Sequence, residues 1–207
     1  MGKVSLSPLL HDTLVFMKKF ASKITVTRTS ICSKSILVEM PEFCDCCFTV
    51  KTRDFAAMLK QTQEFTVEDK ALKYRYEVGV GGDLIKVEKR MKKHDEVYQI
   101  AGGFPLLSIV VNGFKVLSSD DLLIRAGKDG SLTLESFGIV KTKSEYLGLR
   151  VPEHTVDLVA VKVKSRDLRI LEDLRGDLIF SFLDSHILVY SLGNNSTTVV
   201  QIGILST

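Results

Sequence analysis

Apolar and polar residues alternate over short distances along most of the chain. Many segments rich in Val, Ile, Thr and Tyr place apolar side chains at every second position. This period of two predicts β-strands with one buried face. Turn sequences between them predict hairpins at Gly81-Gly82-Asp83, Lys128-Asp129-Gly130 and Gly193-Asn194-Asn195. The predicted strands cover residues 23–30, 33–40, 44–50, 72–78, 83–90, 121–127, 131–137, 139–149, 157–163, 177–183, 186–192 and 197–205.

A strand that ends in a helix is predicted twice. Residues 50–55 read Val-Lys-Thr-Arg-Asp-Phe and residues 163–168 read Val-Lys-Ser-Arg-Asp-Leu, so four of the six positions are identical. The first copy continues with apolar residues at helical spacing, Phe55, Met58 and Leu59, after a polar residue suited to cap a helix. The match indicates that part of the chain is duplicated.

Two further helices are predicted, over residues 7–22 and 104–119. Both segments carry Pro-Leu-Leu near their start, and proline suits the first turn of a helix. Since the two pairs of matching segments occur in the same order, we expect a duplicated α+β protein. The expected domains are residues 1–100 and 101–207, each with antiparallel sheet and two helices, joined near residues 88–103.

The composition is that of a folded, soluble protein. The 207 residues are 45% hydrophobic and 26% charged, which is enough apolar material for a core. No apolar run approaches the ~20 residues that cross a bilayer, and the first ten residues are too polar for a signal peptide. We therefore expect an intracellular protein with no membrane partner. The net charge of +3 is too small to indicate a nucleic-acid partner by itself.

Three of the four cysteines, Cys44, Cys46 and Cys47, lie within four positions, and Cys32 precedes them. Zinc sites usually take their ligands from two close pairs. In a strand, Cys44 and Cys46 would point to one face and Cys47 to the other, so the three thiols could not meet at one ion. We therefore expect buried, reduced thiols and no metal site, and we expect no other cofactor.

Residues 184–186 place Asp, Ser and His side by side. These are the residue types of a hydrolase triad, but neighbours in a strand point to opposite faces. The acidic residues Asp120, Asp121 and Asp157 form no cluster of the kind that holds a nuclease metal. We therefore expect no catalytic residues and no enzyme activity.

The duplicated layout, in which a helix, antiparallel strands and a strand ending in an Asp-containing helix occur twice, resembles that of DNA sliding clamps. The likeness is to the two-domain kind of phages, eukaryotes and eukaryotic viruses, such as proliferating cell nuclear antigen. It implies a ring of six domains, usually three subunits, with helices lining a central hole. The implied partners are double-stranded DNA and a DNA polymerase or other replication and repair proteins, in the nucleus or wherever the DNA is replicated.

Two features differ from the usual clamp pattern. The chain is shorter than typical members, and its net charge is basic where cellular clamps are usually acidic. A monomeric processivity factor and one subunit of a mixed ring are therefore alternatives to a homomeric ring. A non-enzymatic β-rich scaffold protein, viral or cellular, is an alternative of another class.

The resemblance implies a basic face on the helices and a groove for partner peptides. Weak contacts to phosphates need only lysine and arginine, and each such residue could equally be an ordinary surface residue. Ring closure would need exposed strand edges, for which 83–90 and 131–137 are the candidates. The candidate DNA-binding residues are Lys18, Lys19, Arg53, Lys60, Lys115, Arg166 and Arg169. The candidate peptide-binding residues are Met40, Val97, Tyr98, Ile100 and Ile204.

Overall fold

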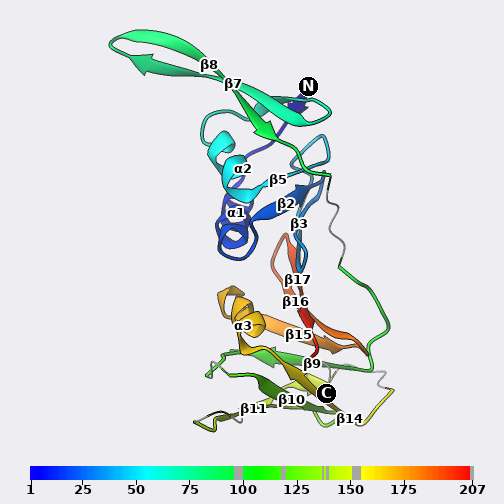
Figure 1. Cartoon of the computed structure of the whole chain (residues 1–207). Coiled ribbons are helices and arrows are strands. Elements are labelled where there is room, and N and C mark those ends of the chain that lie inside the picture. The colour runs from blue at the N-terminus through cyan, green and yellow to red at the C-terminus, as the bar shows by residue number, and fades with distance from the viewer. Residues whose placement is uncertain (96–99, 118–119, 137, 139, 151–154, 206–207) are drawn as a thin grey trace. The chain divides into compact units, whose positions relative to one another are not determined.

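A computed structural model describes residues 1–95, 100–117, 120–136, 138, 140–150 and 155–205 (Figure 1). The chain divides into two compact units, Met1–Gln99 and Ile100–Thr207, called unit 1 and unit 2 below. No helix in the described part of the chain is long and apolar enough to cross a membrane.

Unit 1 contains two helices and two groups of antiparallel strands. One group has the order β1-β6-β7-β8 and the other has the order β4-β3-β2-β5. In chain order the elements are β1 (Gly2–Lys3), α1 (Pro8–Phe20), β2 (Lys23–Val26), β3 (Ser30–Cys32), β4 (Ile36–Glu39), β5 (Phe48–Lys51), α2 (Thr52–Leu59), β6 (Glu64–Val67), β7 (Ala71–Val80) and β8 (Asp83–Lys92).

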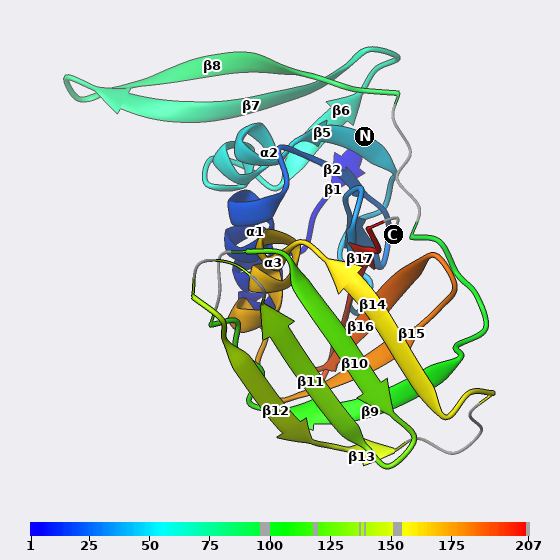
Figure 2. The same cartoon turned by 60° about the horizontal axis from the view of Figure 1, so that its bottom comes forward.

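Unit 2 also contains two groups of antiparallel strands, with the orders β13-β9-β15-β16-β17 and β12-β11-β10-β14 (Figure 2). Its described helices are short. In chain order the elements are β9 (Leu107–Asn112), β10 (Leu122–Gly127), β11 (Ser131–Ser136), β12 (Lys143–Leu147), β13 (Leu149–Arg150), β14 (Leu158–Val163), α3 (Ser165–Leu168), the 3-10 helix η1 (Arg169–Asp173), β15 (Asp177–Phe182), β16 (His186–Leu192) and β17 (Thr197–Gly203).

The two units repeat one topology. The order β1-β6-β7-β8 of unit 1 corresponds to β9-β15-β16-β17 of unit 2, and β4-β3-β2-β5 corresponds to β12-β11-β10-β14. Within each pair of groups, the matching strands follow one another in the same order along the chain. The antiparallel α+β architecture expected from the sequence is therefore confirmed, and the duplication is visible in the strand order.

The first predicted helix is confirmed as α1. Ser7 caps it, because its Oγ accepts a hydrogen bond from the Leu10 N–H at 3.1 Å, and Pro8 occupies the first turn. Leu10, Leu14 and Met17 are buried along one side. This spacing of three and four residues keeps one face of the helix in the core and leaves the other in solvent.

The helix expected over residues 104–119 is wrong. Residues Leu107–Asn112 form strand β9, which pairs with β13 and β15. Buried Leu107, Ile109 and Val111 alternate along it, so the period is two and not 3.6. Gly113 then turns the chain with a φ of 68°, and only nine residues separate β9 from β10. The described residues of this connection, 113–117 and 120–121, form no helix where unit 1 has α1.

The repeated Val-Lys-(Thr/Ser)-Arg-Asp segment does mark the same junction in both units. Lys51 ends β5 and precedes α2, and Lys164 lies between β14 and α3. The next residue, Thr52 or Ser165, is buried in each case. The predicted strand-to-helix transition is confirmed twice, although α3 is only four residues long and continues as η1.

Thr52 joins the end of α1 to the start of α2. Its hydroxyl donates to the carbonyl oxygen of Ala21 at 2.6 Å, and its N–H donates to the carbonyl oxygen of Ser22 at 3.0 Å. Since Thr52 is fully buried, removal of its hydroxyl leaves the Ala21 carbonyl without this donor.

We predict that Thr52→Val lowers the free energy of unfolding by about 1–3 kcal/mol, the usual cost of leaving a buried polar group unsatisfied. Urea unfolding followed by circular dichroism measures it. Thr66→Val is the matched control, since Thr66 is an exposed strand residue, and its change is expected to stay within about 0.5 kcal/mol. Equal effects of the two variants would show that the hydroxyl does not join the helices.

Candidate nucleic-acid interface

The two helices of unit 1 contact each other (Figures 1 and 2). Phe55, Met58 and the apolar side of α1 are buried. Lys18 and Lys19 lie in the last turn of α1 with exposed side chains, and Arg53 lies in the first turn of α2. Because Thr52 is hydrogen-bonded to the residues that follow α1, the basic residues in the last turn of α1 and the first turn of α2 lie near the same junction.

The same junction gathers two lysines that sequence reasoning missed. Lys23 and Lys51 are opposite each other in the pairing of β2 with β5. Lys23 follows α1 by three residues, and Lys51 directly precedes α2. Five basic residues therefore surround the junction and are called the helix-junction patch. They are Lys18, Lys19, Lys23, Lys51 and Arg53.

Lys60 lies at the other end of α2, where it is the C-cap residue. It is exposed, but it follows Thr52 by eight residues, which is about 12 Å along a helix at 1.5 Å per residue. Asp54 is an exposed acidic residue on the same helix. Lys60 therefore extends the basic surface of unit 1 and is not part of the helix-junction patch.

Lys115 lies on the loop after β9 and not on a helix, which corrects its predicted position. Tyr146 of β12 fixes this loop, because its hydroxyl accepts from the Lys115 N–H at 3.1 Å and donates to the Lys115 carbonyl at 2.7 Å. The Val116 N–H donates to the Glu172 carboxylate of η1 at 2.7 Å. The Lys115 side chain is exposed.

The remaining basic candidates of unit 2, Arg166 on α3 and Arg169 on η1, are exposed. Arg166 makes an ion pair of 3.5 Å with its neighbour Asp167. The same short helical segment also carries Glu172 and Asp173, so acidic residues balance the basic ones there.

The two units also differ in their balance of basic and acidic residues. Residues 1–99 contain 17 lysines and arginines against 13 aspartates and glutamates, and residues 100–207 contain 11 against 12. The basic excess of the protein belongs to unit 1, where the helix-junction patch lies. The expected basic face on four helices loses the helix that was to carry Lys115, and DNA binding by the candidate residues stays a prediction.

The predicted peptide-binding residues fall on both units. Val97 and Tyr98 lie outside the described residues. Met40 of unit 1 is buried, with 6% of its surface exposed, and Ile100 and Ile204 of unit 2 are half-buried. The peptide groove stays a prediction.

Ser185 and His186 do contact each other, contrary to the expectation for neighbours in a strand. Ser185 precedes β16 in a bend, and its Oγ lies 2.9 Å from His186 Nδ1. His186 is buried, and its Nε2 lies 3.0 Å from the Ala101 carbonyl oxygen, which makes Nε2 the protonated nitrogen. The histidine thus connects β16 to residue Ala101, and no described contact joins Asp184 to the pair.

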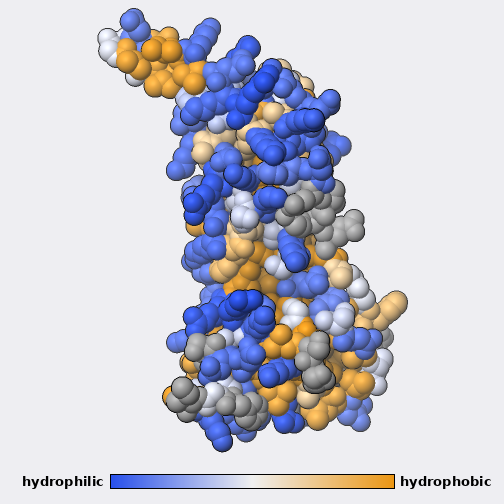
Figure 3. All heavy atoms as spheres, in the orientation of Figure 1, coloured by the Kyte–Doolittle hydropathy of each residue, from blue (hydrophilic) through white to orange (hydrophobic). Residues whose placement is uncertain are grey.

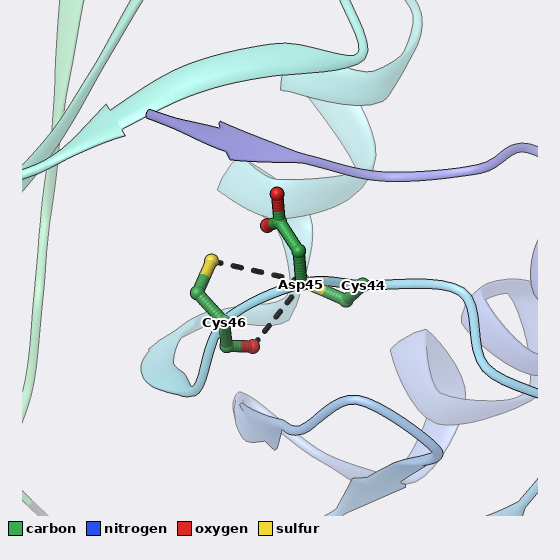
Figure 4. Close-up of side chains that lie close together, drawn as sticks. All are labelled: Cys44, Asp45 and Cys46. Atoms are coloured by element: carbon green, nitrogen blue, oxygen red, sulfur yellow. Dashed lines mark hydrogen bonds between the residues drawn. The ribbon is translucent and has the colours of Figure 1, made fainter.

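The cysteine-rich segment is a bend and not a strand, so the premise that separated its thiols is wrong. Cys44 makes an isolated bridge with Val4, and Asp45 and Cys46 form a bend. The Sγ atoms of Cys44 and Cys46 are 3.9 Å apart, and the Asp45 carboxylate lies within 4.8 Å of both (Figure 4). Burial raises the pKa of both thiols, and the Lys3 N–H holds the pKa of Asp45 below its usual value.

Strands β8 and β12 are among the strands that stand at the end of a sheet and so have a free side within their own unit. β8 is the last strand of the order β1-β6-β7-β8, and β12 is the first of the order β12-β11-β10-β14. The predicted edge over residues 83–90 is therefore confirmed as part of β8. The predicted edge over residues 131–137 is wrong, because β11 pairs with both β10 and β12.

The hairpin of β7 and β8 has one apolar and one charged face. Val78 lies opposite Ile85, with 37% and 48% of their surfaces exposed. The other face carries the ion pair between Arg75 and Glu88 at 2.7 Å. Apolar atoms gather at the end of this hairpin, at the top left of Figure 3. The apolar residues of the first face are Tyr74, Tyr76, Val78, Val80, Ile85 and Val87, and the same face carries Asp83 and Lys89 toward its two ends.

Comparison with solved structures identifies the fold. No family model and no curated protein matches the sequence. The alignment with the Helicobacter pylori beta clamp bound to a DNA ligase peptide covers 100% of this chain and 68% of the clamp chain, with a TM-score of 0.66 and 13% sequence identity. The alignment with the same clamp in complex with 5-chloroisatin covers 64% of the clamp chain, with a TM-score of 0.69 and 12% sequence identity. Proliferating Cellular Nuclear Antigen from Entamoeba histolytica matches 96% of this chain and 95% of its own, with a TM-score of 0.64 and 14% identity.

These matches cover the repeated topology of both units, so the chain has the sliding-clamp fold. It spans about two thirds of the length of the H. pylori chains and nearly the whole length of the E. histolytica chain.

Proposed function

We propose that this protein is a sliding-clamp-like processivity factor, which tracks duplex DNA and tethers a DNA polymerase or another DNA enzyme to it. The observation that carries the proposal is the helix-junction patch, which places five basic residues on the helix side of a unit with the sliding-clamp fold. The proposed role is non-enzymatic, because the chemistry is binding alone.

The patch suits contacts that allow movement along DNA. Lysine and arginine contacts to phosphates carry no sequence information, and they weaken as salt rises because bound counterions are released. The chain therefore binds the backbone of duplex DNA weakly and independently of sequence.

Unit 1 makes most of these contacts in our proposal. Its basic residues outnumber its acidic ones, whereas Arg166 and Arg169 in unit 2 share their helical segment with acidic residues. Lys115 and Arg169 therefore contribute less to DNA binding than Lys18 or Arg53.

The free edges of β8 and β12 support a ring of several copies. The two edges lie in different units, so β8 of one copy can pair with β12 of the next copy. Such a contact joins two different surfaces and is therefore heterologous. Heterologous contacts close into a ring when the rotation between neighbouring copies permits it. The apolar face of the β7–β8 hairpin would be covered in the same contact. With two units per chain, a ring of six clamp domains corresponds to three copies.

Partners and location follow from the proposed role. The H. pylori clamp is bound to a DNA ligase peptide, and we infer that the present protein also binds short peptides of DNA enzymes, with Ile100 and Ile204 among the lining residues. The protein would act in the nucleus, or in the cytoplasm if the DNA is replicated there.

Salt titration tests the proposal. We expect two duplexes of unrelated sequence to bind with equal affinity, and log affinity to fall linearly with log salt, by about 0.9 for each phosphate contacted. A protein scaffold without a DNA partner would show no such association at low salt, and that result would exclude the DNA-binding role.

A further inference from the structure

The bend at Cys44–Asp45–Cys46 places two thiols at the spacing of metal ligands and a carboxylate close to both. In tetrahedral coordination with Zn–S bonds of about 2.3 Å, two sulfur atoms lie about 3.8 Å apart. The Sγ atoms of Cys44 and Cys46 are 3.9 Å apart, so one ion could contact both without movement of the backbone (Figure 4). The Asp45 carboxylate is the third donor, within 4.8 Å of both sulfurs.

Strand β1 and the residues after it hold this bend in place. The Lys3 N–H donates to Asp45 Oδ1 at 2.8 Å, and the Asp45 N–H donates back to the Lys3 carbonyl at 3.3 Å. The Ser5 N–H donates to the Phe43 carbonyl at 2.7 Å. Hydrogen bonds on both sides of the bend therefore fix the donors before an ion arrives, which lowers the cost of assembling the site.

The packing around Cys46 also leaves room for its thiol. A Cβ at Gly2 would lie 3.0 Å from the Cys46 Sγ and 2.6 Å from the Phe65 ring. Glycine at position 2 therefore lets β1 pass close to the thiol without displacing it.

We propose that Cys44, Asp45 and Cys46 form a binding site for one zinc-like divalent ion. The two sulfurs and one carboxylate oxygen occupy three tetrahedral positions, and water occupies the fourth. Both thiols lose their protons when the ion binds. Two sulfur ligands select a borderline-soft ion such as Zn²⁺ over Mg²⁺ or Ca²⁺, which prefer oxygen. With three protein ligands the site is open, so the ion can exchange.

Cys47 provides the control within the same segment. It is exposed, and it does not belong to the cluster of three donors. A surface thiol beside the bend would bind soft metals only weakly and without defined stoichiometry, whereas the proposed site binds one ion through two sulfurs.

Titration of the reduced full chain with Cd²⁺ and with Zn²⁺ tests the site. Cd²⁺ bound to thiolates gives an ultraviolet charge-transfer band, and its intensity follows the number of sulfur ligands. We expect one ion per chain in the wild type and in Cys47→Ser. In Cys46→Ser we expect the intensity of the band to fall by about half. Competition with a chromophoric chelator measures the Zn²⁺ affinity. We expect this affinity to fall by more than the 10–100-fold that is typical for loss of a residue that supports a metal ligand.

Asp45→Asn keeps the test informative if Cys46→Ser fails to fold, since asparagine retains the oxygen that accepts from Lys3. We expect it to bind Cd²⁺ with the full sulfur band and to weaken Zn²⁺ affinity by roughly 10–100-fold. The proposal is wrong if the wild type binds no stoichiometric ion, or if Cys46→Ser and Asp45→Asn bind as tightly as Cys47→Ser.

Discussion

Replacement of Lys18, Lys51 and Arg53 together by alanine is expected to flatten the salt dependence of duplex DNA binding. If each side chain contacts one phosphate, the slope of log affinity against log salt falls by about 2.7, at about 0.9 per contact. These residues come from α1, β5 and α2 and meet at the junction that Thr52 holds together. Fluorescence anisotropy of a labelled duplex over a range of salt concentrations measures the slope.

The matched control removes the same number of charges from other exposed positions. Lys34, Lys70 and Lys141 are exposed and lie outside the helices. Their triple alanine variant should keep the wild-type slope, and both variants should unfold within about 1 kcal/mol of the wild type, because exposed surface changes usually cost little. If both triple variants lower the slope equally, DNA contacts are spread over the surface and the helix-junction patch has no special role.

A single charge on the apolar face of the β7–β8 hairpin is expected to separate the copies of the ring. Ile85→Lys places an ammonium group beside Val78 on the face that the proposed contact covers. An uncompensated buried charge costs about 3–5 kcal/mol, which weakens association roughly 100-fold or more. Size-exclusion chromatography with light scattering at fixed concentration should show the wild type as a trimer and the variant as a monomer.

Leu158→Lys is the control for this variant. Leu158 is 59% exposed and lies on β14, at the opposite side of its sheet from β12. We expect this variant to remain trimeric. A monomeric wild type would exclude the ring and favour a processivity factor that binds DNA as a single chain, and dissociation of both variants would place the interface elsewhere.

Local sequence patterns predicted much of the fold, and their failures have physical causes. The Val-Lys-(Thr/Ser)-Arg-Asp segments were interpreted correctly because a strand, a buried hydroxyl residue and a helix start leave a local signature. Residues 104–119 were mistaken for a helix because their Pro-Leu-Leu matches that of α1. The alternation of Leu107, Ile109 and Val111, which are buried in β9, was the stronger signal.

Features that depend on strand pairing could not be predicted from local patterns. The position of β11 between two neighbours, and so the free side of β12, follows from the order of the sheet. Lys23 and Lys51 are 28 positions apart in sequence and become neighbours through the register of β2 with β5. The helix-junction patch was therefore found only in part, through Lys18, Lys19 and Arg53.

The same limit applies to the cysteines. A strand over residues 44–50 was expected, and the bend at Asp45 depends on hydrogen bonds to Lys3, which is distant in sequence. The candidate metal site thus arises from a tertiary contact that the local sequence does not encode.

Retention on DNA with blocked ends tests the central proposal most directly. Duplex DNA is fixed to a surface at one end, the protein is allowed to enter from the free end, and that end is then closed with a tightly bound protein before the salt is raised. High salt screens the phosphate contacts but cannot open a closed ring on blocked DNA. We predict that the protein stays on blocked DNA and is lost rapidly from DNA with an open end. Equally rapid loss from both would contradict a clamp that encircles DNA.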